Sequence, residues 1–137
     1  MTRLNYITPL FVQGVPKVLE EGVLYISEHY GTASHNCACG CGLRVVTPLT
    51  PTDWKVIREK DGSVTVFPSI GNSDYPCESH YWIRRNKVEW TPKLSRAQIE
   101  AGREFDREQR AAYFADVAAS ERNWLRKVID WVKSRFN

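Results

Sequence analysis

Three cysteines lie within five residues of one another, and a fourth lies much further along the chain. Cys37, Cys39 and Cys41 occupy alternate positions in a glycine-containing segment, and Cys77 follows Pro76. The intervening glycines permit the positive φ angles that would turn three sulfurs toward one point. Four thiolates around one tetrahedral ion form a closed structural zinc site, which leaves no position for a substrate. We therefore predict that these four cysteines hold one structural Zn²⁺.

Two histidines lie close enough to the cysteines in the sequence to replace one of them as a ligand. His35 precedes Cys37 by two residues, and His80 follows Cys77 by three. A histidine in place of one thiolate would leave the site structural, whereas a site with only three protein ligands could activate a water. The remaining alternative is four reduced, buried cysteines without a metal, which their close spacing disfavours.

Serines near His80 could carry out nucleophilic catalysis. Peptide hydrolysis without a catalytic metal needs a nucleophile, a base within hydrogen-bond distance and donors for the oxyanion. Ser69 lies in the segment Pro68–Asn72, which we expect to form a strand-ending turn, and Ser79 is adjacent to His80. Neighbouring side chains of an extended segment point to opposite faces, so Ser69 is the better candidate partner for His80. Three acidic residues could orient the imidazole, namely Glu28, Asp74 and Glu78.

The same residues also have a structural interpretation. Ser69 and Ser79 could be turn residues that make local hydrogen bonds, and His80 could support or bind the metal. His29, the third histidine, lies in a polar segment, and we expect it to be exposed in a loop.

The segments that must position these residues have strand character up to residue 92. Short apolar groups broken by glycine and proline predict strands at Leu10–Val12 and Val23–Ile26. The polar, cysteine-rich segment Ser27–Gly42 predicts a loop, and Leu43–Val46 predicts a return to strand.

Two hairpins are predicted after these strands. Trp54–Arg58 and Ser63–Phe67 flank Asp61-Gly62, a dipeptide typical of tight hairpin turns. Tyr81–Ile83 and Val88–Trp90 flank a second turn near Asn86.

The character of the chain changes after Pro92. Ser95 and Gln98 have the spacing of a capping box, and the proline-free sequence that follows is rich in Ala, Glu, Arg and Gln. We predict an α+β fold: a small zinc-stapled antiparallel β core at residues 1–92, then a helical region at 93–137 with one long or two shorter helices. We expect the helical region to dock on the core, with partner binding and self-association as alternatives. Its apolar residues recur on one helical face, namely Trp124, Leu125, Val128, Ile129, Val132 and Phe136.

Length and composition limit the function classes. A chain of 137 residues with five tryptophans and 42% hydrophobic residues should fold as one main domain. The formal charge of +3 does not indicate nucleic-acid binding. No apolar run approaches the roughly 18 residues of a membrane span, and no secretory signal is evident. We therefore expect a cytoplasmic protein with no membrane partner, and in that reducing compartment clustered cysteines favour metal over disulfides.

Several motifs together resemble a domain family that is encoded beside bacterial ubiquitin-like proteins and their activating-enzyme-like and conjugating-enzyme-like partners. The resemblance covers residues 22–90 and excludes the helical region. It rests on Gly22–Glu28, Tyr30–Ala33, His35, Cys37–Gly42, Val46–Leu49, Pro68–Asn72 and Pro76–Arg84.

The resemblance implies a zinc-containing peptidase that trims precursor ubiquitin-like proteins or removes them from targets. Ser69 or Ser79 would be the nucleophile, and His80 or His35 the base. The implied partners are a bacterial ubiquitin-like protein and a conjugating-enzyme-like protein. Two alternatives stay open: a non-catalytic zinc-ribbon-like adaptor that binds these partners, and a metallopeptidase with an incompletely ligated zinc.

Overall fold

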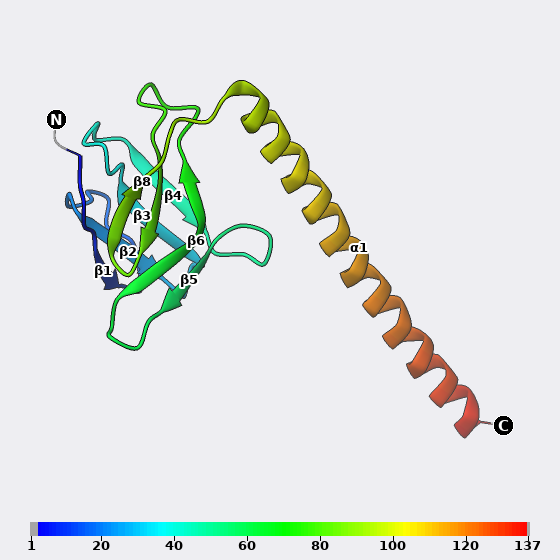
Figure 1. The fold of residues 1–137 in the computed structure, drawn as a ribbon. Helices are drawn as coiled ribbons and strands as arrows, with labels where there is room; N and C mark the ends of the chain where they lie inside the picture. The colour runs from blue at the N-terminus through cyan, green and yellow to red at the C-terminus, as the bar shows by residue number, and fades with distance from the viewer. Residues whose placement is uncertain (1–2, 137) are drawn as a thin grey trace. The chain divides into compact units, whose positions relative to one another are not determined.

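The computed structural model describes residues 3–136, which form two four-stranded sheets followed by one helix (Figure 1). The sheet orders are β1-β2-β3-β4 and β5-β6-β7-β8, and all neighbouring strands pair antiparallel except β1 and β2, which are parallel. The predicted α+β class is confirmed. The elements are β1 (Thr8–Phe11), β2 (Val23–Ser27), β3 (Thr32–Asn36), β4 (Arg44–Pro48), β5 (Lys55–Arg58), β6 (Val64–Gly71), β7 (His80–Arg84), β8 (Lys87–Trp90) and α1 (Arg96–Arg135).

The hairpin predicted around Asp61-Gly62 is confirmed. β5 and β6 pair antiparallel, with Arg58 opposite Val64 at the turn end. Gly62 has a φ of +88°, a conformation that glycine adopts without the steric cost of a Cβ atom.

The second predicted hairpin joins β7 to β8 through Arg85 and Asn86. These two residues have φ angles of +49° and +66°, and Arg84 pairs with Lys87 directly outside them. Two positive φ angles in a two-residue loop are typical of a type I′ turn, whose twist matches that of the strands. The turn thereby fixes the register of β7 against β8.

The structure corrects the loop predicted at Ser27–Gly42. Thr32–Asn36 forms β3, an interior strand between β2 and β4. Its polar sequence suggested a loop, yet Ala33, Ser34 and His35 are all buried. Because β3 has a neighbour on each side, its backbone polar groups are paired within the sheet.

The structure also corrects the strand end predicted at Pro68. β6 continues to Gly71, and its register against β7 shifts between Val66 and Ile70. In such a bulge, one strand contains extra residues that have no direct partner on the neighbouring strand, and the side chains of these residues are redirected. Ser69 lies in this bulge.

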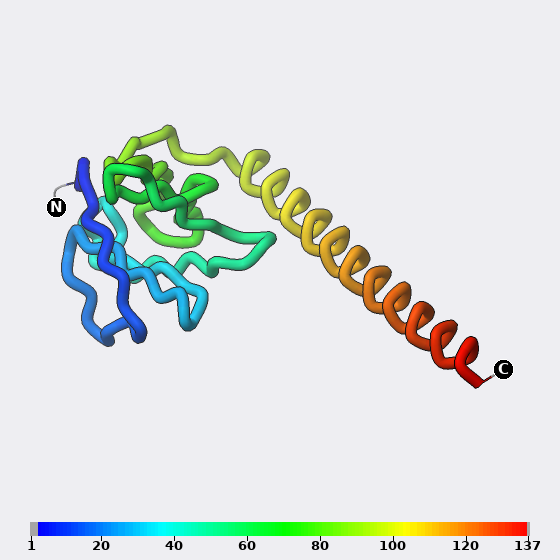
Figure 2. Tube along the Cα trace, turned by 90° about the horizontal axis from the view of Figure 1, so that it is seen from below, coloured from blue at the N-terminus to red at the C-terminus, as the bar shows by residue number. Residues whose placement is uncertain are grey.

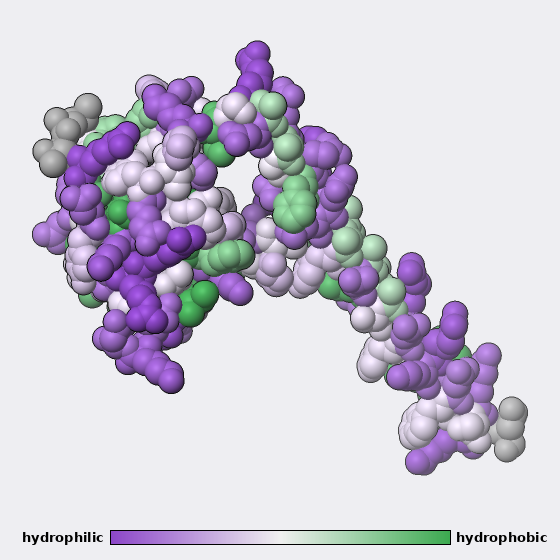
Figure 3. All heavy atoms as spheres, viewed as in Figure 1, coloured by the Kyte–Doolittle hydropathy of each residue, from purple (hydrophilic) through white to green (hydrophobic). Residues whose placement is uncertain are grey.

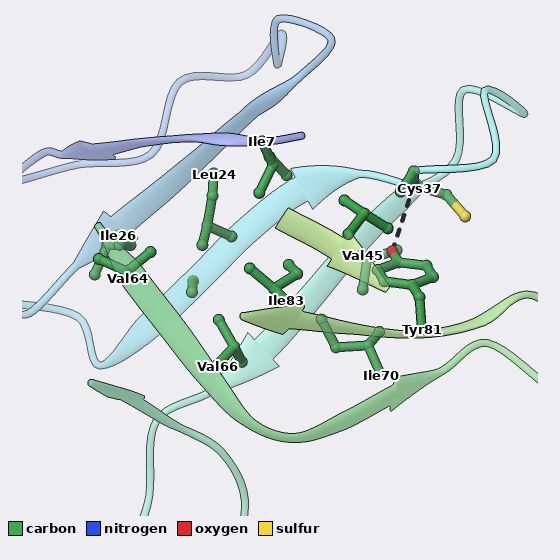
Figure 4. Packing of buried hydrophobic residues seen from close by; sticks show 13 residues of the cluster. Ile7, Leu24, Ile26, Cys37, Val45, Val64, Val66, Ile70, Tyr81 and Ile83 are labelled. Atoms are coloured by element: carbon green, nitrogen blue, oxygen red, sulfur yellow. Dashed lines mark hydrogen bonds between the residues drawn. The ribbon is translucent and has the colours of Figure 1, made fainter. Parts of the chain in front are cut away.

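The hydrophobic core lies between the inner faces of the two sheets. Figure 4 shows Leu24 and Ile26 of β2 directed toward side chains of β6 and β7. A fully buried aliphatic side chain of this kind contributes about 1.5–3 kcal/mol. Cys37 is part of the same cluster, so the cysteine loop begins at the core. The core side chains labelled in Figure 4 are Ile7, Leu24, Ile26, Cys37, Val45, Val64, Val66, Ile70, Tyr81 and Ile83.

The chain divides into two units after Ile99. The first turn of α1, which begins at Arg96, belongs to the first unit. The domain boundary predicted at residue 92 stays a prediction. The predicted capping box is confirmed: Gln98 N–H donates to Ser95 Oγ at 3.1 Å, and Ser95 N–H donates to Gln98 Oε1 at 2.8 Å.

The helix α1 is continuous over 40 residues (Figure 2). No residue of α1 is buried, and Figure 3 shows hydrophobic and hydrophilic residues interspersed along its visible face. No helix among the described residues combines the length and the apolar character needed to cross a membrane. The predicted docking of this helix on the core stays a prediction. The apolar face predicted for it is exposed at Trp124, Leu125, Val128, Ile129, Val132 and Phe136.

Candidate functional site

The four cysteines come from two loops that follow strands. Cys37 directly follows β3, Cys39 and Cys41 lie in the loop between β3 and β4, and Cys77 lies in the loop between β6 and β7. Cys37 N–H donates to the carbonyl of Leu43 at 2.8 Å, which closes the first loop. The glycines within this loop, at positions 40 and 42, have φ angles of +88° and +80°, as predicted from the sequence.

The geometry of the four sulfurs fits a tetrahedral metal ion. All four Sγ atoms lie within 4.8 Å of one another. Cys37 Sγ lies 3.5 Å from Cys39 Sγ and 3.8 Å from Cys77 Sγ, and Cys41 Sγ lies 3.9 Å from Cys77 Sγ. Sulfurs about 2.3 Å from a tetrahedral ion are separated by about 3.8 Å. All four cysteines are free thiols, and they could together hold a metal ion.

Two polar side chains surround the sulfurs and can donate hydrogen bonds to them. Ser79 Oγ lies 3.0 Å from Cys37 Sγ and 3.1 Å from Cys77 Sγ, and Asn72 Nδ2 donates to Cys37 Sγ at 3.6 Å. Both Ser79 and Asn72 are buried. Donors in these positions support negatively charged sulfur, as groups around a metal site commonly do. Ser79, one of the two predicted nucleophiles, therefore faces the cysteine cluster.

The cysteines differ in their tendency to ionise. Burial opposes ionisation of Cys77, but hydrogen bonds from the Ser79 side chain and backbone and from neighbouring thiols lower its pKa to about 7. Burial raises the pKa of Cys37, Cys39 and Cys41. A bound cation would favour the thiolate form of all four, because a coordinating thiol loses its proton.

His35 lies in β3, two residues before Cys37, and it is fully buried. Its Nε2 atom is 2.6 Å from the oxygen of the Tyr81 hydroxyl. The N–H of Ala38 donates to the same oxygen at 3.4 Å, the dashed line in Figure 4. Burial lowers the pKa of His35 to about 4, so the ring is neutral at physiological pH. His35 Nδ1 has no hydrogen-bond partner among the described residues. The structure therefore gives His35 a partner in Tyr81 and brings it to neither candidate serine.

Ser69 and His80 form a hydrogen-bonded pair, with 2.9 Å between Ser69 Oγ and His80 Nε2. β6 and β7 bring them together, because Gly71 is directly opposite His80 in the register and Ser69 lies two residues before Gly71 on the same face. Such diagonal neighbours are within reach of long side chains. Gly71 has no side chain to stand between them: a Cβ added there would lie 3.9 Å from His80 Cδ2.

The other nitrogen of the His80 ring lies against two oxygen atoms. Nδ1 is 2.5 Å from Thr91 Oγ1 and 3.1 Å from the carbonyl oxygen of Pro92. A carbonyl can only accept, so the Pro92 contact is a hydrogen bond in the tautomer that carries the proton on Nδ1. Nε2 is then unprotonated and can accept the hydroxyl proton of Ser69. The pair therefore has the geometry of a nucleophile and its general base.

Thr91 and Pro92 occupy the position for which the sequence predicts an acidic residue. Glu28 forms an ion pair with Arg58, and Glu78 forms one with Lys93 at 3.7 Å. The position of Thr91 beside His80 can be read from the register of the second hairpin. Counting outward from its two turn residues places Thr91 opposite His80, and Thr91 N–H donates to the His80 carbonyl at 3.0 Å.

Comparison with known proteins gives one family. A model of the family described as bacterial ubiquitination-like system serine protease (BubE) matches residues 11–91. The chain belongs to this family. No curated protein and no solved structure matches it.

Membership of the BubE family confirms the resemblance found in the sequence motifs. The matched residues extend from β1 to Thr91 and include the four cysteines and the Ser69–His80 pair. Residues 92–137, with α1, lie outside the match. The family name indicates a serine protease of a bacterial ubiquitination-like system.

Proposed function

We propose that this chain is a zinc-stabilised serine peptidase that processes precursor ubiquitin-like proteins or releases them from their targets. Ser69 is the nucleophile and His80 is the general base. The observation that carries the proposal is the 2.9 Å contact between Ser69 Oγ and His80 Nε2, with His80 Nδ1 held by Thr91 and the Pro92 carbonyl. The family's description as a serine protease supports the same chemistry.

The reaction is acyl transfer. His80 Nε2 takes the hydroxyl proton of Ser69 as Oγ bonds to the scissile carbonyl carbon. The C–N bond then breaks, and the leaving amine takes the proton from His80. A water molecule, deprotonated by the same nitrogen, then attacks the acyl carbon. The bond between this carbon and Ser69 Oγ breaks, Oγ takes the proton back from His80, and the carboxylate is released. We place the developing oxyanion against the backbone N–H groups of the β6 bulge, beginning with that of Ser69.

We assign the metal to zinc with a structural role. Four thiolates fill the tetrahedral coordination that zinc prefers in structural sites, which leaves no position for a substrate or an activated water. The metal would tie the loop that holds Cys39 to the loop that holds Cys77, and this second loop leads directly into His80 at the start of β7. Zinc would thereby hold the general base in place without taking part in the reaction.

The test is cleavage of the precursor of a bacterial ubiquitin-like protein. We expect the wild-type protein to cleave it, Ser69→Ala and His80→Ala to be inactive, and Ser79→Ala to be active when zinc is saturating. Circular dichroism and zinc content verify that each variant is folded. A wild-type protein that binds the precursor without cleaving it would favour the adaptor. Activity that survives in Ser69→Ala would overturn the assignment of the nucleophile.

A further inference from the structure

The end of β6 that carries Ser69 has a neighbouring strand on one side only. The pairing of β5 with β6 ends where Lys55 lies opposite Phe67, while β6 continues to Gly71. On its other side, β6 stays paired with β7 up to Gly71 and His80. The last residues of β6 therefore form a short edge beside the candidate nucleophile.

The hydrogen bonds around this edge show which backbone groups point toward it. Asn72 N–H donates to the Ser79 carbonyl at 2.8 Å, which continues the pairing with β7. The Ser69 carbonyl accepts from Trp54 Nε1 at 3.2 Å, and Trp54 directly precedes β5. Successive residues of a strand direct their N–H and C=O groups to opposite edges. Gly71 therefore directs both groups to the same side as the Ser69 carbonyl, away from β7, and Gly71 is exposed.

We propose that the substrate binds as an additional strand whose backbone pairs with the N–H and C=O of Gly71. This inference rests on the proposed function of Ser69. Addition of an extended peptide to an open sheet edge is a common way to bind polypeptides, since main-chain hydrogen bonds supply affinity that does not depend on the side chains. It implies a substrate class: an extended segment such as a flexible terminal tail, rather than a helix or a tight turn.

The shortness of the edge favours a substrate over a second copy of the protein. Pro68 has no N–H to donate, and the Ser69 carbonyl is already bonded to Trp54. Pairing is therefore limited to the few backbone groups around Gly71. The hydrogen bonds that can form there are too few to join two copies of the protein through their sheets. The two hydrogen bonds of Gly71 are enough to align a peptide whose scissile carbonyl reaches Ser69.

A matched pair of variants distinguishes the effect of removing the Gly71 N–H from the effect of adding a side chain there. Gly71→Ala and Gly71→Pro both add a Cβ, which would lie 3.2 Å from Leu94 Cδ1, but only proline removes the N–H. Because this N–H points away from β7, proline leaves the β6–β7 ladder intact. The two variants are compared by their rate of labelling with a small fluorophosphonate and by kcat/KM on a peptide that spans the cleaved bond.

We expect equal labelling of the two variants, and a kcat/KM about tenfold lower for Gly71→Pro than for Gly71→Ala, which is the size of one lost hydrogen bond. The loss should lie mainly in KM. Equal kcat/KM for the two variants would overturn the inference while leaving the proposed function intact.

Peptides with single N-methyl groups test the same pairing on the wild-type protein, so the test does not depend on the folding of Gly71→Pro. Methylation should block cleavage at one amide and be tolerated at the adjacent ones, because amides of a strand alternate between the two edges. Tolerance at every position would contradict strand addition. If the wild-type protein neither reacts with fluorophosphonate nor cleaves any peptide, the proposed function and this inference both fail.

Discussion

The imidazole of His80 is oriented by oxygen atoms that carry no formal charge. Its Nδ1 lies 2.5 Å from Thr91 Oγ1 and 3.1 Å from the Pro92 carbonyl. A carboxylate in this position would stabilise a protonated imidazole more strongly, since charge-assisted hydrogen bonds are roughly twice as strong as neutral ones. We therefore expect Thr91 to act mainly by fixing the tautomer and the orientation of the ring.

Replacement of Thr91 tests this role. Thr91→Val removes the hydroxyl but keeps the shape of the side chain, and the Pro92 carbonyl still accepts from Nδ1. We expect kcat on a peptide substrate to fall by about tenfold, or about 1.4 kcal/mol, with KM nearly unchanged. Thr91→Ser, which keeps the hydroxyl, should recover most of this loss. A serine variant as slow as the valine variant would show that the methyl group matters and the hydroxyl does not.

Ser79 lies against two cysteine sulfurs, although it is adjacent in the sequence to His80, the proposed general base. Its hydroxyl lies 3.0 Å and 3.1 Å from the sulfurs of Cys37 and Cys77. Ser79→Ala should weaken zinc binding by about 10- to 100-fold, as loss of a group that supports the ligands commonly does. Competition with a chromophoric chelator measures this change. A fall in kcat to the level of Ser69→Ala, at saturating zinc, would instead place Ser79 in the reaction.

At the level of elements, the turn between β7 and β8 determines which residue lies opposite His80. Asn86 has a φ of +66° and its buried side chain accepts from Val64 N–H at 2.8 Å and donates to the Tyr6 hydroxyl at 3.2 Å. This one residue therefore fixes the hairpin turn and joins it to β6 and to the N-terminal segment.

Two substitutions of Asn86 separate its backbone and side-chain contributions. Asn86→Gly keeps the positive φ but loses both side-chain hydrogen bonds, so we expect a loss of about 1–3 kcal/mol in the free energy of unfolding. Asn86→Ala should lose about 1 kcal/mol more, because alanine is strained at this φ. Urea denaturation of the zinc-bound protein measures both values. Equal free energies of unfolding for the two variants would show that the positive φ at residue 86 does not affect stability.

The parts of the fold that depend on local sequence could be predicted. Asp61-Gly62 and the alternating residues beside it determine the first hairpin, and Ser95 with Gln98 determines the start of α1. β3 could not be predicted, because its burial depends on β2 and β4 rather than on its own polar residues. The continuation of β6 past Pro68 likewise depends on pairing with β7.

In the candidate site too, some features could be predicted from local sequence and others depend on the pairing of strands. Its residue types and spacing were enough to propose the four cysteines and to favour Ser69 over Ser79 as the partner of His80. The orienting groups could not be chosen by residue type, because threonine hydroxyls and proline carbonyls are not distinctive of this role. They followed only from the register of β7 and β8.

For the whole molecule, a metal ion held by the four cysteines would link the two sheets. Cys37 and its neighbours follow β3 of one sheet, and Cys77 precedes β7 of the other. Because binding energy at a structural zinc site is also folding energy, removal of the metal should unfold the β core and abolish activity together. Circular dichroism and peptide cleavage, followed during titration with a chelator, should change in parallel.

Substitution of the metal separates structural from catalytic zinc. Cd²⁺ is a thiolate-binding ion, so it should restore both the fold and most of the activity of the stripped protein if the metal is only structural. A cadmium protein that is folded but inactive, while the zinc protein is active, would favour the metallopeptidase alternative.

The site of covalent labelling by a fluorophosphonate, determined by mass spectrometry of the digested protein, shows directly whether Ser69 is the nucleophile. A serine activated by a hydrogen-bonded imidazole reacts with such a probe, whereas ordinary serines do not. We predict one adduct on Ser69, which disappears in Ser69→Ala and in His80→Ala. An adduct on Ser79, or no adduct on folded, zinc-loaded protein, would contradict the account.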